Sequence, residues 1–185
     1  MKTPTLETDR LVLRPISLDD APAIQKHFNN WEIIQHLGLA VPWPYPNDGA
    51  ETWIRDAMLP KIKNGDTHAW VLTEREGDQQ AIGVLHYRKE LESAGNRGFW
   101  LAVPYQGKGY MTEAVTALND FLFFELGVKR YEVCNAKSNI ASRRVKEKTG
   151  AIFVRYGNCP HHSGDKTSEH WEITYENWAK IRGRD

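Results

Sequence analysis

YQGKGYMTEA, residues 105–114, is the stretch that decides the fold of this chain. It follows a strand-like run at 99–103 and begins a long amphipathic helical pattern. A glycine-rich turn between a strand and a helix leaves several backbone N–H groups unpaired, and the helix dipole adds partial positive charge there. Gly107 and Gly109 lack the Cβ atoms that would keep a ligand away from the backbone. The sequence therefore predicts an anion cradle for a phosphate or pyrophosphate at this turn.

Nucleotide-binding turns differ in the spacing of their glycines. The Walker type needs G-x-x-x-x-G-K-[ST], and this turn lacks both the loop length and the Lys-Ser/Thr pair. The dinucleotide fingerprint G-x-G-x-x-G needs a third glycine where Thr112 stands. The turn instead matches Q-x-x-G-x-[GA] through Gln106 and Gly109, with Met111 as a departure. For the glycines alone, an ordinary strand-to-helix turn is an equal alternative.

Two further segments accompany the turn. Residues 132–135 have the pattern of a strand, and residues 139–149 have that of a helix ending at Gly150, a typical C-cap. TDRLVLRP stands at 8–15, and the turn belongs to a longer stretch at 98–114. Together these motifs resemble the GNAT superfamily of acetyl-CoA-dependent N-acetyltransferases. More narrowly, they resemble the branch of ribosomal-protein N-terminal (RimJ/RimL-type) acetyltransferases, over nearly the whole chain.

The composition predicts a single domain spanning residues 1–185. A chain of 185 residues buries a sizeable core, and a formal net charge of zero gives no reason to expect nucleic-acid binding. Cys134 and Cys159 lie far apart, outside any C-x-x-C spacing, which favours reduced thiols. No apolar run approaches a signal core or a membrane span. We therefore expect a cytoplasmic protein without membrane or nucleic-acid partners, as a monomer or a homodimer.

Alternating strands and helices predict an α/β (α+β) fold. The expected strands lie at 10–14, 68–73, 81–87, 98–103, 132–135, 152–156 and 171–175, the last two as a hairpin. The expected helices lie at 17–28, 52–62, 139–149 and after the glycine turn, and 38–48 is a proline-broken loop. Strands followed by crossover helices imply a sheet with a parallel portion. With the resemblance, we expect a mixed, mostly antiparallel central sheet with a splayed parallel strand pair, flanked by helices.

The resemblance implies a binding mode for acetyl-CoA. In the family the pantetheine arm enters the gap between the splayed strands and pairs with one of them. Here the pairing residues would be Leu101, Ala102 and Val103, and Asn139 would bond the arm, although a helix N-cap is an equal role for it. The pyrophosphate would be held by the turn residues Gln106, Gly107, Lys108, Gly109, Tyr110 and Met111. A strand N–H in the gap would polarise the thioester carbonyl.

The catalytic groups are implied by the same resemblance. The reaction is direct attack by a neutral amine, without a covalent enzyme intermediate. Many relatives place a Tyr where this chain has Lys146, and Ser142 is then the candidate acid or hydrogen-bond donor to the departing thiolate. A Glu that serves as base in many relatives is replaced by Asn96, which cannot take a proton at neutral pH. The alternative bases are His86, His170 and Glu172. For each of them, a surface or structural role is the simpler interpretation.

The acceptor site is expected beside the proline-rich segment VPWPYP, residues 41–46. Trp43 and Tyr45 in this segment, with Trp31 nearby in sequence, are candidate walls of a peptide or amine pocket, and His86 is assigned to the same site. Simple loop packing is an equal alternative. His161, His162, Asp165 and His170 match no standard zinc spacing, so no metal is expected.

The function predicted from these residues is acetyl transfer from acetyl-CoA to a primary amine, most simply a protein N-terminal α-amine. A small-amine acceptor, such as an antibiotic or a polyamine, is the alternative within the enzyme class. The absent Glu and Tyr leave a third alternative, a non-catalytic acyl-CoA-binding regulatory module.

Overall fold

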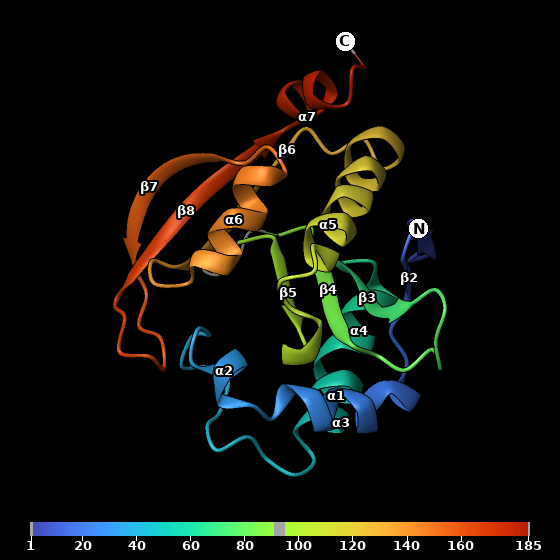
Figure 1. Ribbon diagram of the computed structural model, residues 1–185, viewed down its shortest axis with the longest axis vertical. Coiled ribbons are helices and arrows are strands. Elements are labelled where there is room, and N and C mark those ends of the chain that lie inside the picture. Colours follow the sequence, from blue (N-terminus) through green and yellow to red (C-terminus); the bar gives the residue numbers. More distant parts are fainter. Residues whose placement is uncertain (1, 91–94, 185) are drawn as a thin grey trace.

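Two sheets form the centre of the structure, a computed structural model that describes residues 2–90 and 95–184 (Figure 1). The larger sheet takes its strands in chain order: β1 (Leu6–Glu7), β2 (Leu11–Pro15), β3 (Thr67–Glu74), β4 (Gly83–Arg88) and β5 (Arg97–Leu101). The smaller sheet has the order β6 (Arg130–Ala136), β8 (Thr167–Thr174), β7 (Ile152–Asn158). Neighbouring strands within each sheet are antiparallel. The expected mixed, mostly antiparallel α/β fold is thus confirmed.

β5 and β6 meet at the start of β5 and then belong to different sheets. A bridge joins Gly95 to Val133, and the Asn96 N–H donates to the Glu132 carbonyl at 2.7 Å. Gly95 has φ of +81°, and a Cβ there would stand 2.8 Å from the Glu132 oxygen, so this close approach requires glycine. Within the described residues no parallel ladder joins the two strands. The predicted single sheet is therefore divided in two at the predicted splay.

Helices cover both faces of the larger sheet because its strands alternate between two buried clusters. Along β3, Trp70 and Leu72 belong to one cluster, and Ala69 and Val71 belong to the other. The first face carries α5 (Tyr110–Asp120), continued by a π-helical turn at Phe121–Glu125. The second carries α1 (Ala21–Phe28), α2 (Trp31–Ile34), α3 (Gly49–Thr52), a π-helical stretch at Trp53–Met58, and α4 (Leu59–Asn64). α6 (Ile140–Lys148) lies between α5 and the smaller sheet (Figure 1).

Several element boundaries differ from the sequence prediction for local reasons. β5 ends at Leu101 and not at Val103, because Val103–Tyr105 forms a 3-10 turn around a proline that has no N–H for a ladder. β8 begins at Thr167, earlier than the expected 171. Tyr175 opens α7 (Tyr175–Ile181), a helix that the sequence did not predict.

The helices of the described residues include none that is long and apolar enough to cross a membrane.

Candidate active site

The turn after β5 presents free backbone donors at the start of α5. Gly107 and Gly109 have φ of +76° and +83°, and nothing lies within 4 Å of the place that a Cβ on Gly107 would occupy. Among the described residues, no acceptor bonds the N–H groups of residues 107–112. The Gln106 N–H is different: it donates to the Val103 carbonyl at 3.1 Å, so the free donors begin at Gly107. Open space, unpaired donors and the helix dipole together suit a pyrophosphate.

The N-terminal motif braces this turn. The Glu113 carboxylate accepts from the Thr8 hydroxyl at 2.6 Å and from the Arg10 N–H at 2.9 Å, and the Arg10 Nε lies 2.7 Å away. Arg10 also donates to the Lys108 carbonyl at 3.0 Å and covers the Tyr110 ring at 4.7 Å. Desolvation opposes ionisation of Glu113, but the bonds from Thr8 and Arg10 outweigh it and hold its pKa below the usual value. The two motifs are far apart in the chain, so the sequence pattern alone did not predict this contact.

The segment predicted to pair with the pantetheine arm keeps backbone donors that face away from β4. The carbonyls of Ala102 and Val103 accept bonds within the 3-10 turn, and the Leu101 carbonyl accepts from the Gln106 side chain at 2.8 Å. The Ala102 N–H donates to the Ile82 carbonyl at 2.8 Å. The N–H of Val103 has no acceptor among the described residues. Leu101 lies opposite Gly83 at a non-hydrogen-bonded position of the β4–β5 ladder, so its N–H also faces away from β4. Both N–H groups suit the amides of the arm or the thioester oxygen.

Ser142 and Lys146 lie together beside the gap between β5 and β6. They stand one helical turn apart on α6, and the Lys146 Nζ donates to the Ser142 Oγ at 2.8 Å. The ammonium also lies 5.8 Å from the centre of the Phe99 ring of β5. Burial is the main cause that lowers the pKa of Lys146 to about 7, and the positive charge of Arg97 adds to it. From the sequence, Lys146 stands only where many relatives have a Tyr, and its burial was not predicted.

Asn139 caps α6, the helix that carries these groups. Its side-chain oxygen accepts from the Ser142 N–H at 3.0 Å, which is the N-cap role that the sequence left open. Its pantetheine contact stays a prediction. On the same helix, the Arg143 Nε bonds the carboxylate of Glu169 on β8 at 2.9 Å.

Asn96 joins three strands. Its side-chain amide donates to the carbonyls of Arg88 and Lys89 at 3.0 and 3.3 Å, and its oxygen accepts from the Glu132 N–H at 2.9 Å. Both amide hydrogens are therefore used in structural bonds at the point where β4, β5 and β6 meet. Its predicted catalytic role has no supporting contact.

The three alternative bases are poorly placed to take a proton. Burial, followed by the charges of Arg88 and Lys61, lowers the pKa of His86 to about 3, so this ring stays neutral. His86 instead fills the space beside Gly98, where a Cβ would stand 2.5 Å from the ring. His170 bonds Ser168 at 3.0 Å, and Glu172 pairs with Arg130 at 2.9 Å.

Two of the three predicted acceptor aromatics lie together. The rings of Trp31 and Trp43 have centroids 5.2 Å apart, and the His162 ring lies 6.2 Å from Trp31. Both indoles remain about two-fifths exposed, at 41% and 40%. Tyr45 turns away and packs edge-on against Phe28 at 5.0 Å. We call Trp31, Trp43 and His162 the aromatic wall.

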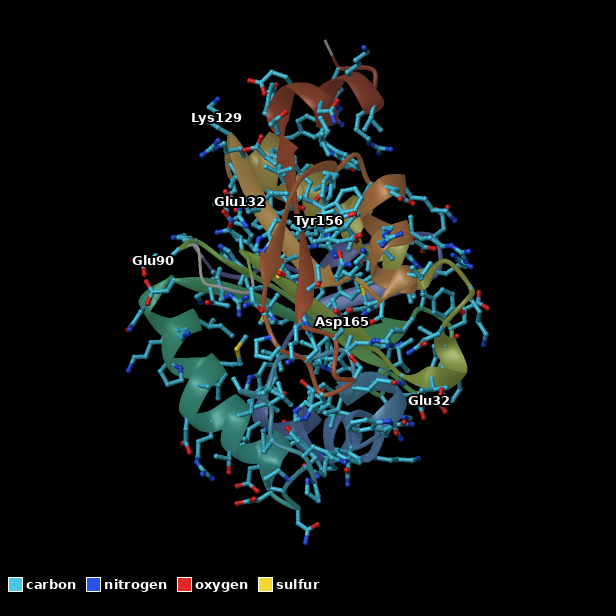
Figure 2. The ribbon with its side chains drawn as sticks, turned by 90° about the vertical axis from the view of Figure 1, so that its left-hand side faces the viewer. Glu32, Glu90, Lys129, Glu132, Tyr156 and Asp165 are labelled. Atoms are coloured by element: carbon cyan, nitrogen blue, oxygen red, sulfur yellow. The ribbon has the colours of Figure 1, made fainter. Side chains whose placement is uncertain are left out.

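The connection between β7 and β8 holds this wall in place. The Ser163 N–H donates to the Gln35 carbonyl at 2.8 Å, and the His162 ring bonds the Val41 carbonyl at 2.7 Å. Figure 2 shows the same connection, marked by Asp165, above helix α2, which carries Glu32. The β7–β8 connection therefore packs against residues 35–41, which are distant in the sequence. His161 and His162 both have structural hydrogen-bond partners. The described residues contain no group of three His, Cys, Asp or Glu side chains that could hold a metal ion.

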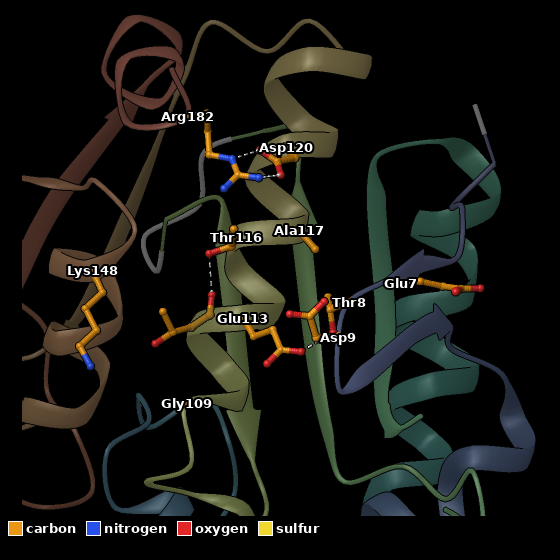
Figure 3. Close-up of a pocket in the computed structure, with 11 residues that line it drawn as sticks. Glu7, Thr8, Asp9, Gly109, Glu113, Thr116, Ala117, Asp120, Lys148 and Arg182 are labelled. Atoms are coloured by element: carbon orange, nitrogen blue, oxygen red, sulfur yellow. Dashed lines mark hydrogen bonds and ion pairs between the residues drawn. The ribbon is translucent and has the colours of Figure 1, made fainter. Parts of the chain in front are cut away.

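A hollow of about 520 Å³ lies along the outer face of α5 (Figure 3). It reaches Gly109 at one end, and the ion pairs of Glu113 with Arg10 and Asp120 with Arg182 lie along it. The core-facing side of α5 carries Met111, Ala114, Val115 and Leu118. The body of the helix and the sheet therefore separate the hollow from the aromatic wall. The hollow is not part of the acceptor site expected beside that wall.

Comparison with known proteins agrees with this geometry. Residues 10–152 match the family described as acetyltransferase (GNAT) domain. YoaA of Bacillus subtilis strain 168, an uncharacterised N-acetyltransferase, is 29% identical over 150 residues, which is 80% of this chain and 82% of that protein. The ribosomal-protein-S5-alanine acetyltransferase of Vibrio fischeri has a TM-score of 0.79 at 19% identity, covering 95% of this chain and 98% of that chain. Mycobacterium smegmatis RimJ, in complex with CoA-disulfide, gives 0.79 at 18% identity, covering 100% and 98%. The chain therefore belongs to the GNAT acetyltransferase family and is an acyltransferase with acetyl-CoA as its donor.

Proposed function

We propose that this enzyme acetylates the N-terminal α-amino group of a protein. The aromatic wall is the observation that carries the proposal. Half-exposed indoles of Trp31 and Trp43 offer flat apolar contact to an extended chain. Similar structures, those from Vibrio fischeri and Mycobacterium smegmatis, include a ribosomal-protein acetyltransferase and RimJ.

The charges around the wall favour a peptide over a polyamine. A multiply charged cation needs several carboxylates to replace its hydration. Glu51 is paired with Arg55 at 3.0 Å, and Asp165 accepts the N–H groups of Ser138 and Thr167 at 2.8 and 2.9 Å. Glu51 and Asp165 are therefore already engaged, which leaves fewer carboxylates near the wall for a multiply charged ligand.

An α-amine also fits a site without a strong base. Its pKa is about 7.7–8.0, so a useful fraction is neutral near pH 7.5 and attacks without a protein carboxylate. The cradle and the Val103 N–H position the thioester, and orientation then supplies much of the rate. The Ser142 hydroxyl donates a proton or a hydrogen bond to the CoA sulfur as the C–S bond breaks.

An acceptor screen tests the proposal. CoA release is measured with N-terminal peptides, the same peptides with blocked α-amines, spermidine and an aminoglycoside. We expect turnover with free peptides and none with the blocked ones. Strong activity on spermidine with no activity on any peptide would overturn the proposal, and no CoA release with any amine would favour a non-catalytic module.

Trp43→Ala tests the wall itself. We expect it to raise the KM for peptide about tenfold while leaving acetyl-CoA binding unchanged, because the wall lies away from the cradle. Phe153→Ala is the matched control, since Phe153 on β7 is as exposed as Trp43, at 40%. Equal effects of the two substitutions would remove the wall from acceptor binding.

A further inference from the structure

A buried cationic pair lies beside the gap between β5 and β6, where the proposed mechanism places the sulfur of CoA. Lys146 is 1% exposed and Arg97 is 3% exposed, and both reach the space beside β5 and β6. Arg97 donates to the Tyr131 hydroxyl at 2.9 Å, but its Nε and Nη2 atoms are buried without a hydrogen-bond partner among the described residues. Buried charges are normally paired. Unpaired N–H donors on a buried guanidinium therefore indicate an anion that is present only part of the time.

The carboxylate that acts on Lys146, Glu169, already has other hydrogen-bond partners. Glu169 of β8 is bonded by Arg143 and by the Asn135 side-chain amide at 3.1 Å. The other titratable group that faces Lys146 is Cys134 of β6. Among the residues that the structure describes, two cations and a hydroxyl thus lie here without a dedicated counter-charge. Acetyl transfer generates one anion at this place, the sulfur of CoA as it leaves.

We propose that Lys146 is a positioning residue that supplies the leaving-group proton through the Ser142 hydroxyl. This inference rests on the direct-transfer mechanism proposed above. The C–N bond forms, the C–S bond breaks, and its electron pair goes to sulfur. Sulfur takes the Ser142 hydroxyl proton, and the Ser142 oxygen takes a proton from the Lys146 ammonium 2.8 Å away. Neutral Lys146 regains a proton from solvent, which balances the proton that the acceptor nitrogen loses on becoming an amide.

The relay explains why lysine serves here in place of the family's tyrosine. A lysine in water holds its proton too tightly at neutral pH to give it up readily, but burial and the charge of Arg97 bring its pKa to about 7. The same burial removes competing water. Ser142 remains the group that contacts the sulfur, and Lys146 acts only through it.

The pH profile of kcat, measured at saturation with the best amine of the acceptor screen, tests the relay. We expect the wild-type kcat to fall on an alkaline limb near pH 7, as Lys146 loses its proton. Lys146→Met should lower kcat roughly 100-fold, within the range for a general acid, and abolish the limb, with the KM for acetyl-CoA changed less than about threefold. Lys146→Tyr should recover most of kcat with the limb moved toward pH 10.

Lys146→Arg separates charge from proton transfer. Arginine keeps the cation but does not release its proton in this pH range. We expect a folded protein with low kcat and no alkaline limb. A folded Lys146→Arg or Lys146→Met enzyme with the wild-type kcat and limb would overturn the proposal. The surface substitution Lys129→Met is the control and should change neither quantity.

Two measurements keep this test independent of the proposed function. The NMR titration of the Lys146 Cε group in the wild-type protein reports its pKa without turnover, and an ordinary value near 10.4 would overturn the relay. Ser142→Ala should reproduce the lowered kcat. If Ser142→Ala is fully active, the proposed leaving-group role of Ser142 fails, and the relay fails with it. A change of acceptor class alone would move the limb set by the acceptor amine and would leave the alkaline limb of Lys146 in place.

Discussion

Glu113→Gln tests whether the N-terminal motif braces the cradle. The Glu113 carboxylate accepts bonds from the Thr8 hydroxyl and the Arg10 N–H at 2.6 and 2.9 Å. A hydrogen bond to a charged group contributes about 1.5–3 kcal/mol and a neutral one about 0.5–1.5, so losing the charge weakens each by about 1 kcal/mol. The Arg10 side chain is 47% exposed, so its ion pair adds little. We expect a loss of about 2 kcal/mol in the free energy of unfolding.

The assay is thermal unfolding combined with calorimetric titration of acetyl-CoA. For a chain of this size, about 2 kcal/mol corresponds to a fall in Tm of roughly 4–8 °C. If about half of that energy holds the turn, the Kd for acetyl-CoA rises about fivefold. Glu51→Gln is the control, because Glu51 forms an exposed ion pair with Arg55, and it should change either quantity little.

The pH dependence gives a second check on the brace. The folded state holds the pKa of Glu113 below its usual value, so the stabilisation is present above the unfolded pKa of about 4.3 and is lost as pH falls through the folded pKa. The difference between wild type and Glu113→Gln should therefore be full at neutral pH and should shrink in acid. Equal Tm and equal Kd for the two proteins at pH 7 would refute the brace.

Three other substitutions have outcomes that follow from the geometry. Gly109→Val should abolish acetyl-CoA binding in a folded protein, as judged by calorimetry, because φ of +83° excludes a β-branched residue and the backbone must approach the phosphates. Gly98→Ala should cost about 1–3 kcal/mol in denaturant unfolding, since its Cβ would stand 2.5 Å from the His86 ring. Wild-type stability should rise between pH 7 and about 10.5, because the unfolded chain binds the Lys146 proton more tightly than the folded one, and Lys146→Met should flatten that rise.

Local sequence patterns predicted the parts of the site that depend on local geometry. The glycine turn was predictable because Gly107 and Gly109 supply the left-handed backbone that a strand-to-helix turn needs. Asn139 was predictable as a cap because an Asn before a helical pattern bonds the N–H three residues on. The end of β5 at Leu101 was missed because the strand-like apolar run conceals the effect of Pro104.

Other parts depend on contacts between distant segments, and a single sequence does not contain them. Arg10 and Glu113 are 103 residues apart, so the reason for two separate motifs appears only when α5 lies beside the first strands. The burial of Lys146 depends on strands from both sheets, whereas its position on α6 alone suggests an ordinary surface lysine. His162 joined the aromatic wall only because the β7–β8 connection crosses to residues 35–41.

The described residues of the site offer a buried lysine but no well-placed strong base, and both features have one chemical explanation. Acetyl transfer requires two proton transfers: one proton is removed from the attacking amine, and one is delivered to the departing sulfur. An α-amine with a pKa of about 7.7–8.0 largely solves the first by itself, so replacement of a carboxylate by Asn96 costs little for this acceptor. A side-chain lysine amine, with a pKa near 10.4, would be protonated at neutral pH and would need that lost base. The residues of this site therefore favour an acceptor of low pKa, and in the relay proposed above the Ser142–Lys146 pair delivers the proton on the leaving-group side.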